Sequence, residues 1–145
     1  MRFIDSNVLI YAVDSTDAEK QWRARCIVRD AISSIAYMVS AQVINEFCAV
    51  AFRKLRKPIE EIEGFLEVLE RIKTVPVMPA WSRRALEVAR FYNLQFYDSL
   101  LLAAAEANGC SEFWSEDLND GQMYCGMKAV NPFKEFGKNK QGEKR

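Results

Sequence analysis

Short apolar runs alternate along the chain with longer segments in which apolar positions recur at helical spacing. The first run, residues 2–4, is followed at once by Asp5-Ser6-Asn7, residue types that favour turns and helix caps. Later runs have the length and the β-branched or aromatic content of strands. The pattern predicts five short strands, at 2–4, 36–39, 75–78, 112–115 and 128–130.

Between these runs, apolar residues return every three or four positions, as in helices with one buried face. The segment 96–108 gives the strongest pattern, because it is rich in alanine and leucine and is closed by Gly109, a typical left-handed cap. Ser40 is expected to cap the helix after it. One predicted helix begins at Val8, and another begins at Ala41 and ends in the basic run 53–57. The other predicted helices cover 17–34, 59–72, 80–92 and 96–108.

Strands that alternate with helices predict right-handed crossovers and a parallel sheet covered on both faces. We therefore expect a three-layer α/β/α fold with a short, mostly parallel central sheet of four to five strands. The length of 145 residues suits one domain, expected over residues 1–136, with a polar and frayed tail over 137–145.

Apolar stretches stay far below the ~20 residues of a membrane helix, and an acid at position 5 interrupts any secretory signal. No membrane partner and a cytoplasmic location are therefore expected. The four cysteines lie far apart without a CxxC pair, as buried thiols do in a reducing compartment. Lysine plus arginine equals aspartate plus glutamate, 20 each, so a polyanion would need a local basic patch.

The chain contains no histidine. Its absence removes the commonest general base, the Ser-His and Cys-His nucleophile pairs and nearly all catalytic zinc sites. Any chemistry must therefore depend on carboxylates, amines or hydroxyls.

Carboxylates follow two predicted strands at the edge where parallel sheets bind ligands. Asp5 comes directly after the first strand, Asp117 comes two residues after the fourth, and Asp120 lies one turn further on. Glu46 and Asp98 occupy helix positions at which an apolar residue would pack better. Because a lone charge at such positions is costly, the group of acids is more informative than any member.

Taken singly, each acid has an ordinary structural explanation. Asp5 could cap the first helix, and Glu46 could pair with a buried arginine. Asp98 is favourably placed near a helix N-terminus, and Asp117 or Asp120 could close a turn. Together, however, these acids would raise one another's pKa values unless a cation neutralised them.

A cation bound by oxygen atoms, without histidine or thiolate, is expected to be Mg²⁺ or Mn²⁺. One or two such ions can activate water and stabilise charge on a phosphoryl oxygen, which suits phosphodiester hydrolysis. If the basic run lies near the acids, its cations are candidate RNA contacts. The alternative is that they only interact favourably with the helix dipole and with water. The cations of the basic run are Arg53, Lys54, Arg56 and Lys57.

The order of these segments resembles the PIN-domain family, and within it the toxin ribonucleases of VapBC toxin-antitoxin pairs. Five motifs in the family's order carry the resemblance and cover nearly the whole chain. They are Phe3-Ile4-Asp5-Ser6-Asn7-Val8-Leu9-Ile10-Tyr11, Asn45-Glu46-Phe47, the segment 96–105, the segment 115–122 and Asn131-Pro132-Phe133.

This resemblance implies an endoribonuclease that uses Mg²⁺ or Mn²⁺, is a homodimer, and is paired with an antitoxin whose peptide covers the active site. The implied metal-binding and catalytic residues are Asp5, Glu46, Asp98 and Asp117. Asp120 is either a further ligand or a group that supports the ligands. The implied supporting residues are Ser6, Asn7 and Ser115.

Two other classes remain open. A haloacid dehalogenase-like phosphatase also has a nucleophilic aspartate after its first strand, although Asn7 stands where that family requires a second aspartate. The chain could also be a non-catalytic RNA- or protein-binding module that keeps the same fold, or a receiver-like acidic pocket.

Overall fold

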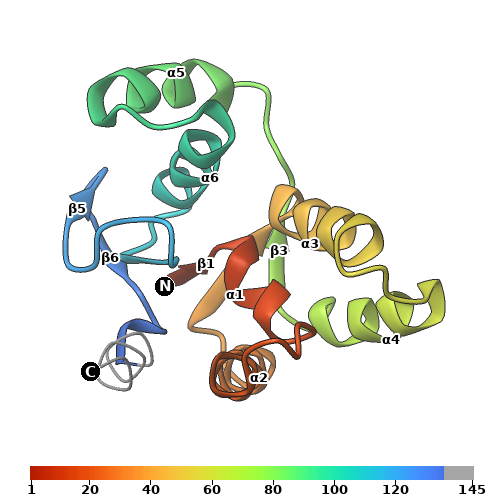
Figure 1. The fold of residues 1–145 in the computed structure, drawn as a ribbon. Coiled ribbons are helices and arrows are strands. Elements are labelled where there is room, and N and C mark those ends of the chain that lie inside the picture. The colour runs from red at the N-terminus through yellow and green to blue at the C-terminus, as the bar shows by residue number, and fades with distance from the viewer. Residues whose placement is uncertain (136–145) are drawn as a thin grey trace.

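The computed structural model describes residues 1–135, so the predicted tail at 137–145 lies outside the described residues. Within residues 1–135 the chain forms six strands and six helices (Figure 1). In chain order they are β1 (Arg2–Ile4), α1 (Ser6–Tyr11), α2 (Ala18–Ser33), β2 (Tyr37–Ser40), α3 (Ala41–Arg53), α4 (Ile59–Leu69), β3 (Lys73–Val75), α5 (Trp81–Tyr92), α6 (Phe96–Ala107), β4 (Glu112–Trp114), β5 (Met123–Tyr124) and β6 (Met127–Val130).

The strands form one sheet in the order β3-β2-β1-β4-β6-β5, in which only β5 runs antiparallel to its neighbour. From β1 the chain moves outward to β2 and β3, then returns past β1 to β4. Because parallel crossovers are right-handed, this reversal puts α1 to α4 on one face and α5 and α6 on the other. Figure 1 shows α5 and α6 stacked together, away from α2 and α4. The predicted three-layer, mostly parallel fold is confirmed.

The strand order creates a crevice at the carboxyl ends of β1 and β4. These strands are neighbours, with Ile4 opposite Trp114, but the chain leaves β1 for β2 on one side and β4 for β6 on the other, toward opposite edges of the sheet. The Asp5 N–H donates to the carbonyl oxygen of Trp114 at 2.9 Å, which continues the pairing past the end of β1. Such a switch point is where open α/β sheets bind ligands, and here it brings Asp5 beside the segment that follows β4.

Apolar packing fixes the elements that carry the acids. Phe3 and Phe113 stack at the sheet centre, with ring centroids 5.3 Å apart. On α3, Val43, Phe47 and Ala51 form a buried stripe at i, i+4 and i+8. Full burial of each larger side chain contributes about 1.5–3 kcal/mol, so the rotation of α3 about its axis is well determined.

Two strands differ from the prediction. β3 covers residues 73–75 and stops before Pro76, which lacks the N–H that a continued ladder with β2 would need. β5 was not predicted; it pairs with β6 across the two-residue turn Cys125-Gly126, where φ is 53° and 79°. Positive φ at both positions defines a type I′ hairpin turn. The sheet therefore has six strands instead of four to five.

Helix beginnings also differ from the prediction. α1 starts at Ser6 instead of Val8, because the Asp5 side chain accepts a hydrogen bond from the Ser6 N–H. Ser40 precedes α3 as expected but makes no side-chain capping bond, and its hydroxyl oxygen is buried without a partner within residues 1–135. None of the helices in this part of the chain has both the length and the apolar character needed to cross a membrane.

Candidate active site

Asp5 lies at the centre of the site, where its side chain is only 5% exposed. Its Oδ1 accepts from the Ser6 N–H at 2.6 Å, and its Oδ2 accepts from the Ser115 hydroxyl at 2.8 Å. Burial, together with the smaller effect of the charges of Glu46 and Asp117, raises the pKa of Asp5 from 3.8 to about 7 against these hydrogen bonds. Asp5 therefore both caps α1 and carries a strongly disfavoured charge.

Glu46 projects from the middle of α3 and is held from both sides. The Ser6 hydroxyl donates to its Oε2 at 2.7 Å, and the Gln42 amide donates to its Oε1 at 2.8 Å. The same amide donates to the carbonyl oxygen of Tyr97 at 3.0 Å, which links α3 to the start of α6. Both hydrogens of that amide are thus used, and Glu46 has a fixed orientation.

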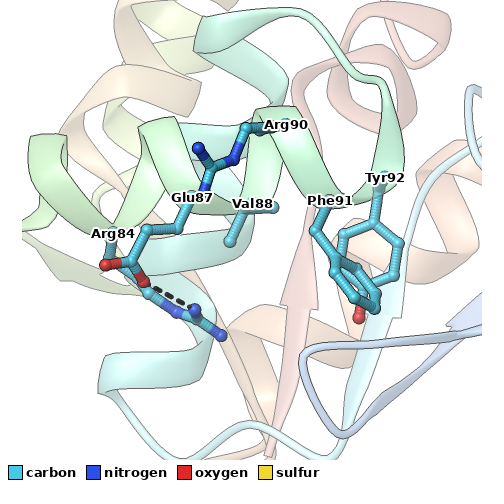
Figure 2. A pocket seen from close by; sticks show the side chains of 6 residues that line it. All are labelled: Arg84, Glu87, Val88, Arg90, Phe91 and Tyr92. Atoms are coloured by element: carbon cyan, nitrogen blue, oxygen red, sulfur yellow. Dashed lines mark hydrogen bonds and ion pairs between the residues drawn. The ribbon is translucent and has the colours of Figure 1, made fainter.

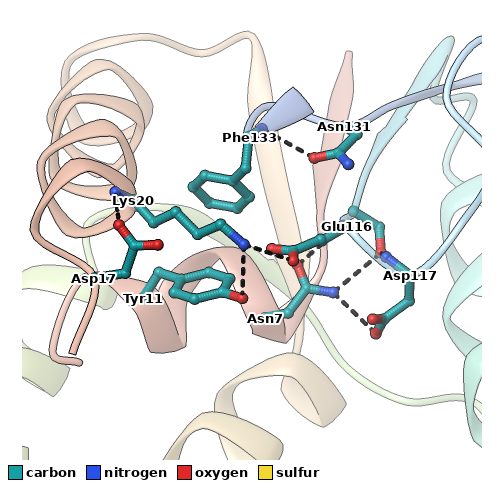
Figure 3. A network of polar contacts seen from close by, with 9 residues as sticks. Asn7, Tyr11, Asp17, Lys20, Glu116, Asp117, Asn131 and Phe133 are labelled. Atoms are coloured by element: carbon teal, nitrogen blue, oxygen red, sulfur yellow. Dashed lines mark hydrogen bonds and ion pairs between the residues drawn. The ribbon is translucent and has the colours of Figure 1, made fainter. Parts of the chain in front are cut away.

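Asn7 connects the two strand ends. Its Nδ2 lies 3.3 Å from Asp5 Oδ2, 3.1 Å from Ser115 Oγ and 3.1 Å from Asp117 Oδ2. Its Oδ1 accepts from the Glu116 N–H at 3.3 Å, while the Asp117 N–H donates to Ser115 Oγ at 3.0 Å (Figure 3). The amide therefore ties the start of α1 to the loop after β4.

Asp98 occupies the first turn of α6 and is half-buried. Burial raises its pKa, and the charges of Asp117 and Glu46 add to the effect. Asp98 is thus coupled to both acids, although it comes from the opposite face of the sheet. Four elements, the loop after β1, α3, α6 and the loop after β4, bring one acid each to the same crevice.

Within the part of the chain that the structure describes, these acids have no cationic partner of their own. Within residues 1–135, none of the four takes part in a salt bridge. In the same part of the chain, no three carboxylate or thiol groups form a ready-made metal site. Serine hydroxyls and the Asn7 amide stand between Asp5 and its acidic neighbours, which accounts for the spacing. The donor set is oxygen-rich and lacks histidine, which fits a hard divalent cation.

Asp120 is placed apart from the other acids. Its Oδ1 accepts from the Asn131 N–H at 2.8 Å, and its Oδ2 lies 2.9 Å from the Lys134 ammonium group. The Asn131 hydrogen bond and Lys134 lower the pKa of Asp120, opposite to the shifts of Asp5 and Asp98. The geometry therefore favours the turn-closing explanation for Asp120.

Asp120→Asn is expected to leave divalent-metal binding unchanged and to lower the free energy of unfolding by about 0.2–1 kcal/mol, since it removes one exposed ion pair. The amide can still accept the Asn131 N–H. Calorimetric titration with Mn²⁺ and urea denaturation measure the two quantities. A clear loss of Mn²⁺ affinity would return Asp120 to the set of metal ligands.

The basic run lies at the C-terminal end of α3 and in the residues that follow it. α3 begins directly after β2, at the carboxyl edge of the sheet, and ends at Arg53. Arg53 is seven residues beyond Glu46, roughly 10 Å along the helix at about 1.5 Å per residue. Lys57 lies 3.7 Å from Glu61 in an ion pair. Contact of the basic run with RNA therefore stays a prediction.

Two of the hollows on the surface of residues 1–135 are relevant to the location of the site. One borders the acids and is mostly apolar; it is lined by Gln42, Asn45, Glu46, Ala49, Val77, Tyr97 and Leu100. The other, shown in Figure 2, lies on α5 and is lined by Arg84, Glu87, Val88, Arg90, Phe91 and Tyr92. The α5 hollow shares no residue with the acidic crevice, and its Arg84 and Glu87 already form an ion pair. It is therefore not part of the candidate active site.

Fold and site together define an α/β/α protein with an acidic crevice at the switch point of a parallel sheet. The sequence model of the PIN domain matches residues 2–119. The chain therefore belongs to the PIN-domain family, and the resemblance indicated by the sequence motifs is confirmed. Comparison with curated protein sequences gave no match.

Solved structures similar to this chain include a toxin-antitoxin complex and a toxin from bacteria. A toxin-antitoxin complex from Klebsiella pneumoniae has a TM-score of 0.67 at 17% identity, covering 91% of this chain and 98% of that chain. VapC20 of Mycobacterium tuberculosis, a sarcin-ricin loop cleaving toxin, has a TM-score of 0.65 at 15% identity, covering 81% of this chain and 92% of that chain. VapBC2 of Rickettsia felis, bound to a promoter DNA fragment, has a TM-score of 0.63 at 13% identity, covering 90% of this chain and 97% of that chain. At these identities the similarity establishes the fold.

Proposed function

We propose that this protein is a Mg²⁺- or Mn²⁺-dependent endoribonuclease. The observation that carries the proposal is the buried Asp5 carboxylate. Its pKa is raised to about 7, and within residues 1–135 it faces other acids without a cationic side chain as partner. Keeping such a group charged is costly unless a cation compensates it. Membership of the PIN-domain family, together with a VapC-like fold, supports nuclease chemistry.

Asp5, Glu46, Asp98 and Asp117 would hold the ion, which supplies a water of lowered pKa and stabilises charge on a phosphoryl oxygen. The remaining site residues orient these carboxylates. Ser6 and Gln42 fix the two oxygens of Glu46, and Ser115 fixes one oxygen of Asp5. Because the chain has no histidine, the carboxylates are the available proton acceptors in the crevice.

A toxin role in the cytoplasm, with an antitoxin partner and a homodimeric state, is part of the same proposal. Its support is the likeness to the toxin-antitoxin complex from Klebsiella pneumoniae, with a TM-score of 0.67 at 17% identity. RNA contact by Arg53, Lys54, Arg56 and Lys57 stays a prediction; these cations would bind phosphates that flank the scissile one.

Cleavage of end-labelled RNA, with and without structure, is expected in Mg²⁺ or Mn²⁺ and not in chelator. Hydrolysis by water should leave 5′-phosphate and 3′-hydroxyl ends, so one 2′-deoxy substitution at the cleaved position should be tolerated. Product analysis by mass spectrometry measures both. Cyclic-phosphate ends would refute the scheme, and RNA binding without metal-dependent cleavage would favour a non-catalytic module. An aspartyl-phosphate adduct would favour a haloacid dehalogenase-like phosphatase.

A further inference from the structure

Lys20 lies behind the acidic crevice and belongs to none of the motifs. Its ammonium group is 2.8 Å from Glu116 Oε1 and donates to the Tyr11 hydroxyl at 3.3 Å. It also lies 4.8 Å from the ring centroid of Tyr11 and 5.8 Å from that of Phe133. Figure 3 shows these side chains converging from α1, α2, the loop after β4 and the segment after β6.

The ion pair between Lys20 and Glu116 is less exposed than the other pairs in residues 1–135. The side chains are 17% and 28% exposed, against 44% and 33% for the pair of Arg84 with Glu106. In this described part of the chain, Glu116 Oε2 is buried without a hydrogen-bond partner. Charge compensation of the Glu116 carboxylate therefore depends on Lys20.

Glu116 is connected directly to the candidate site. It precedes Asp117, and its N–H donates to Asn7 Oδ1 at 3.3 Å. The Nδ2 of the same asparagine reaches Asp117 Oδ2 at 3.1 Å and Asp5 Oδ2 at 3.3 Å. A displacement of Glu116 would therefore reach both acids through one amide group.

We propose that Lys20 is a positioning residue that acts through Glu116 on Asp117. By holding the Glu116 carboxylate between α1 and α2, it fixes the loop after β4 and keeps a fifth carboxylate from joining the four acids of the crevice. This inference rests on the proposed metal-dependent function. Without the ammonium group, the Glu116 side chain must turn toward water, and the loop that carries Asp117 moves with it.

Lys20→Met tests the proposal, since it keeps the apolar stem near Tyr11 and Phe133 and removes the charge. The Kd for Mn²⁺, measured without RNA by the EPR signal of free Mn²⁺, is expected to rise about tenfold, as for other groups that orient metal ligands. Hydrogen exchange of the Glu116 and Asp117 amides should accelerate. Lys20→Arg should restore most of the affinity.

Two further variants separate positioning from general destabilisation. Arg84→Met removes a cation from an exposed pair on α5 and should change neither Mn²⁺ affinity nor exchange at Asp117. Adding Glu116→Gln to Lys20→Met removes the stranded charge and should recover Mn²⁺ affinity to within about threefold of the wild-type value. This double variant also tests the proposal if Lys20→Met alone does not fold.

The outcomes distinguish this inference from the proposed function. Unchanged Mn²⁺ affinity in Lys20→Met, or no recovery in the double variant, would overturn the role of Lys20. A wild-type protein that binds Mn²⁺ but cleaves no RNA would overturn the ribonuclease proposal alone. A wild-type protein that binds no Mn²⁺ would overturn both.

Discussion

Asp98→Asn should reduce RNA cleavage by about 10²–10³-fold while leaving the fold intact. The substitution removes one negative charge at almost constant volume from a half-buried position coupled to Asp117 and Glu46. Loss of a metal-site carboxylate is expected to raise the barrier by about 3–4 kcal/mol, at about 1.4 kcal/mol per tenfold in rate. Because burial disfavours the charge in the metal-free protein, the amide should not lower stability. Measurements of kcat/KM and thermal unfolding test both parts.

Asp120→Asn provides the matched control, since it makes the same chemical change at an acid that lies apart from the other four and is already paired with Lys134. It should retain cleavage within a few-fold of wild type. Equal losses in the two variants would indicate a general effect of charge. Full activity of Asp98→Asn would exclude Asp98 from the site.

The metal-free protein is expected to lose stability as the pH rises from about 4 to about 7. The pKa of Asp5 is raised from 3.8 to about 7 in the folded state by burial and neighbouring acids. Between these values the folded state binds more protons than the unfolded state, so the free energy of unfolding falls with pH. The shift corresponds to a loss of about 4 kcal/mol at most. The pKa of Asp98 is raised too, with the same sign.

Urea denaturation in chelator across pH 4–8 measures this loss, and Asp5→Asn is the control. In that variant the slope should be much smaller, because its amide does not titrate. Mn²⁺ added at pH 8 should restore stability to the wild type by mass action and leave Asp5→Asn little changed. Parallel curves for the two proteins, or wild-type stability that rises over this range, would contradict the assignment of the buried charge to Asp5.

Hydrophobic periodicity was sufficient to predict the order of elements and the parallel sheet. The strand at 75–78 was misplaced because Val75, Val77 and Met78 have strand composition, whereas pairing with β2 ends before Pro76. β5 was missed because two residues are too few for any periodic pattern. Its turn at Cys125-Gly126 also lacks the asparagine or aspartate that usually precedes glycine in such turns.

The positions of the acids, after strands and in the first turns of helices, predict that they lie together. Their hydrogen-bond partners depend on tertiary contacts that the sequence does not reveal. Gln42 has the composition of a solvent-facing residue; it is buried because the start of α6 crosses α3 and offers the Tyr97 carbonyl. Its spacing of four from Glu46 was the available local indication. For Ser40, local preference predicts a cap, but its buried hydroxyl makes no capping hydrogen bond.

The pairing of β1 with β4 has a consequence for biosynthesis. Asp5 and Ser115, which share a hydrogen bond, are 110 positions apart. During translation, Asp5 is synthesised long before Ser115. An amino-terminal fragment that lacks β4 therefore has no strand beside Asp5 on the β4 side of β1. Such long-range closure comes late during folding. The hydrogen bond between Asp5 and Ser115 can therefore form only after β4 has been synthesised.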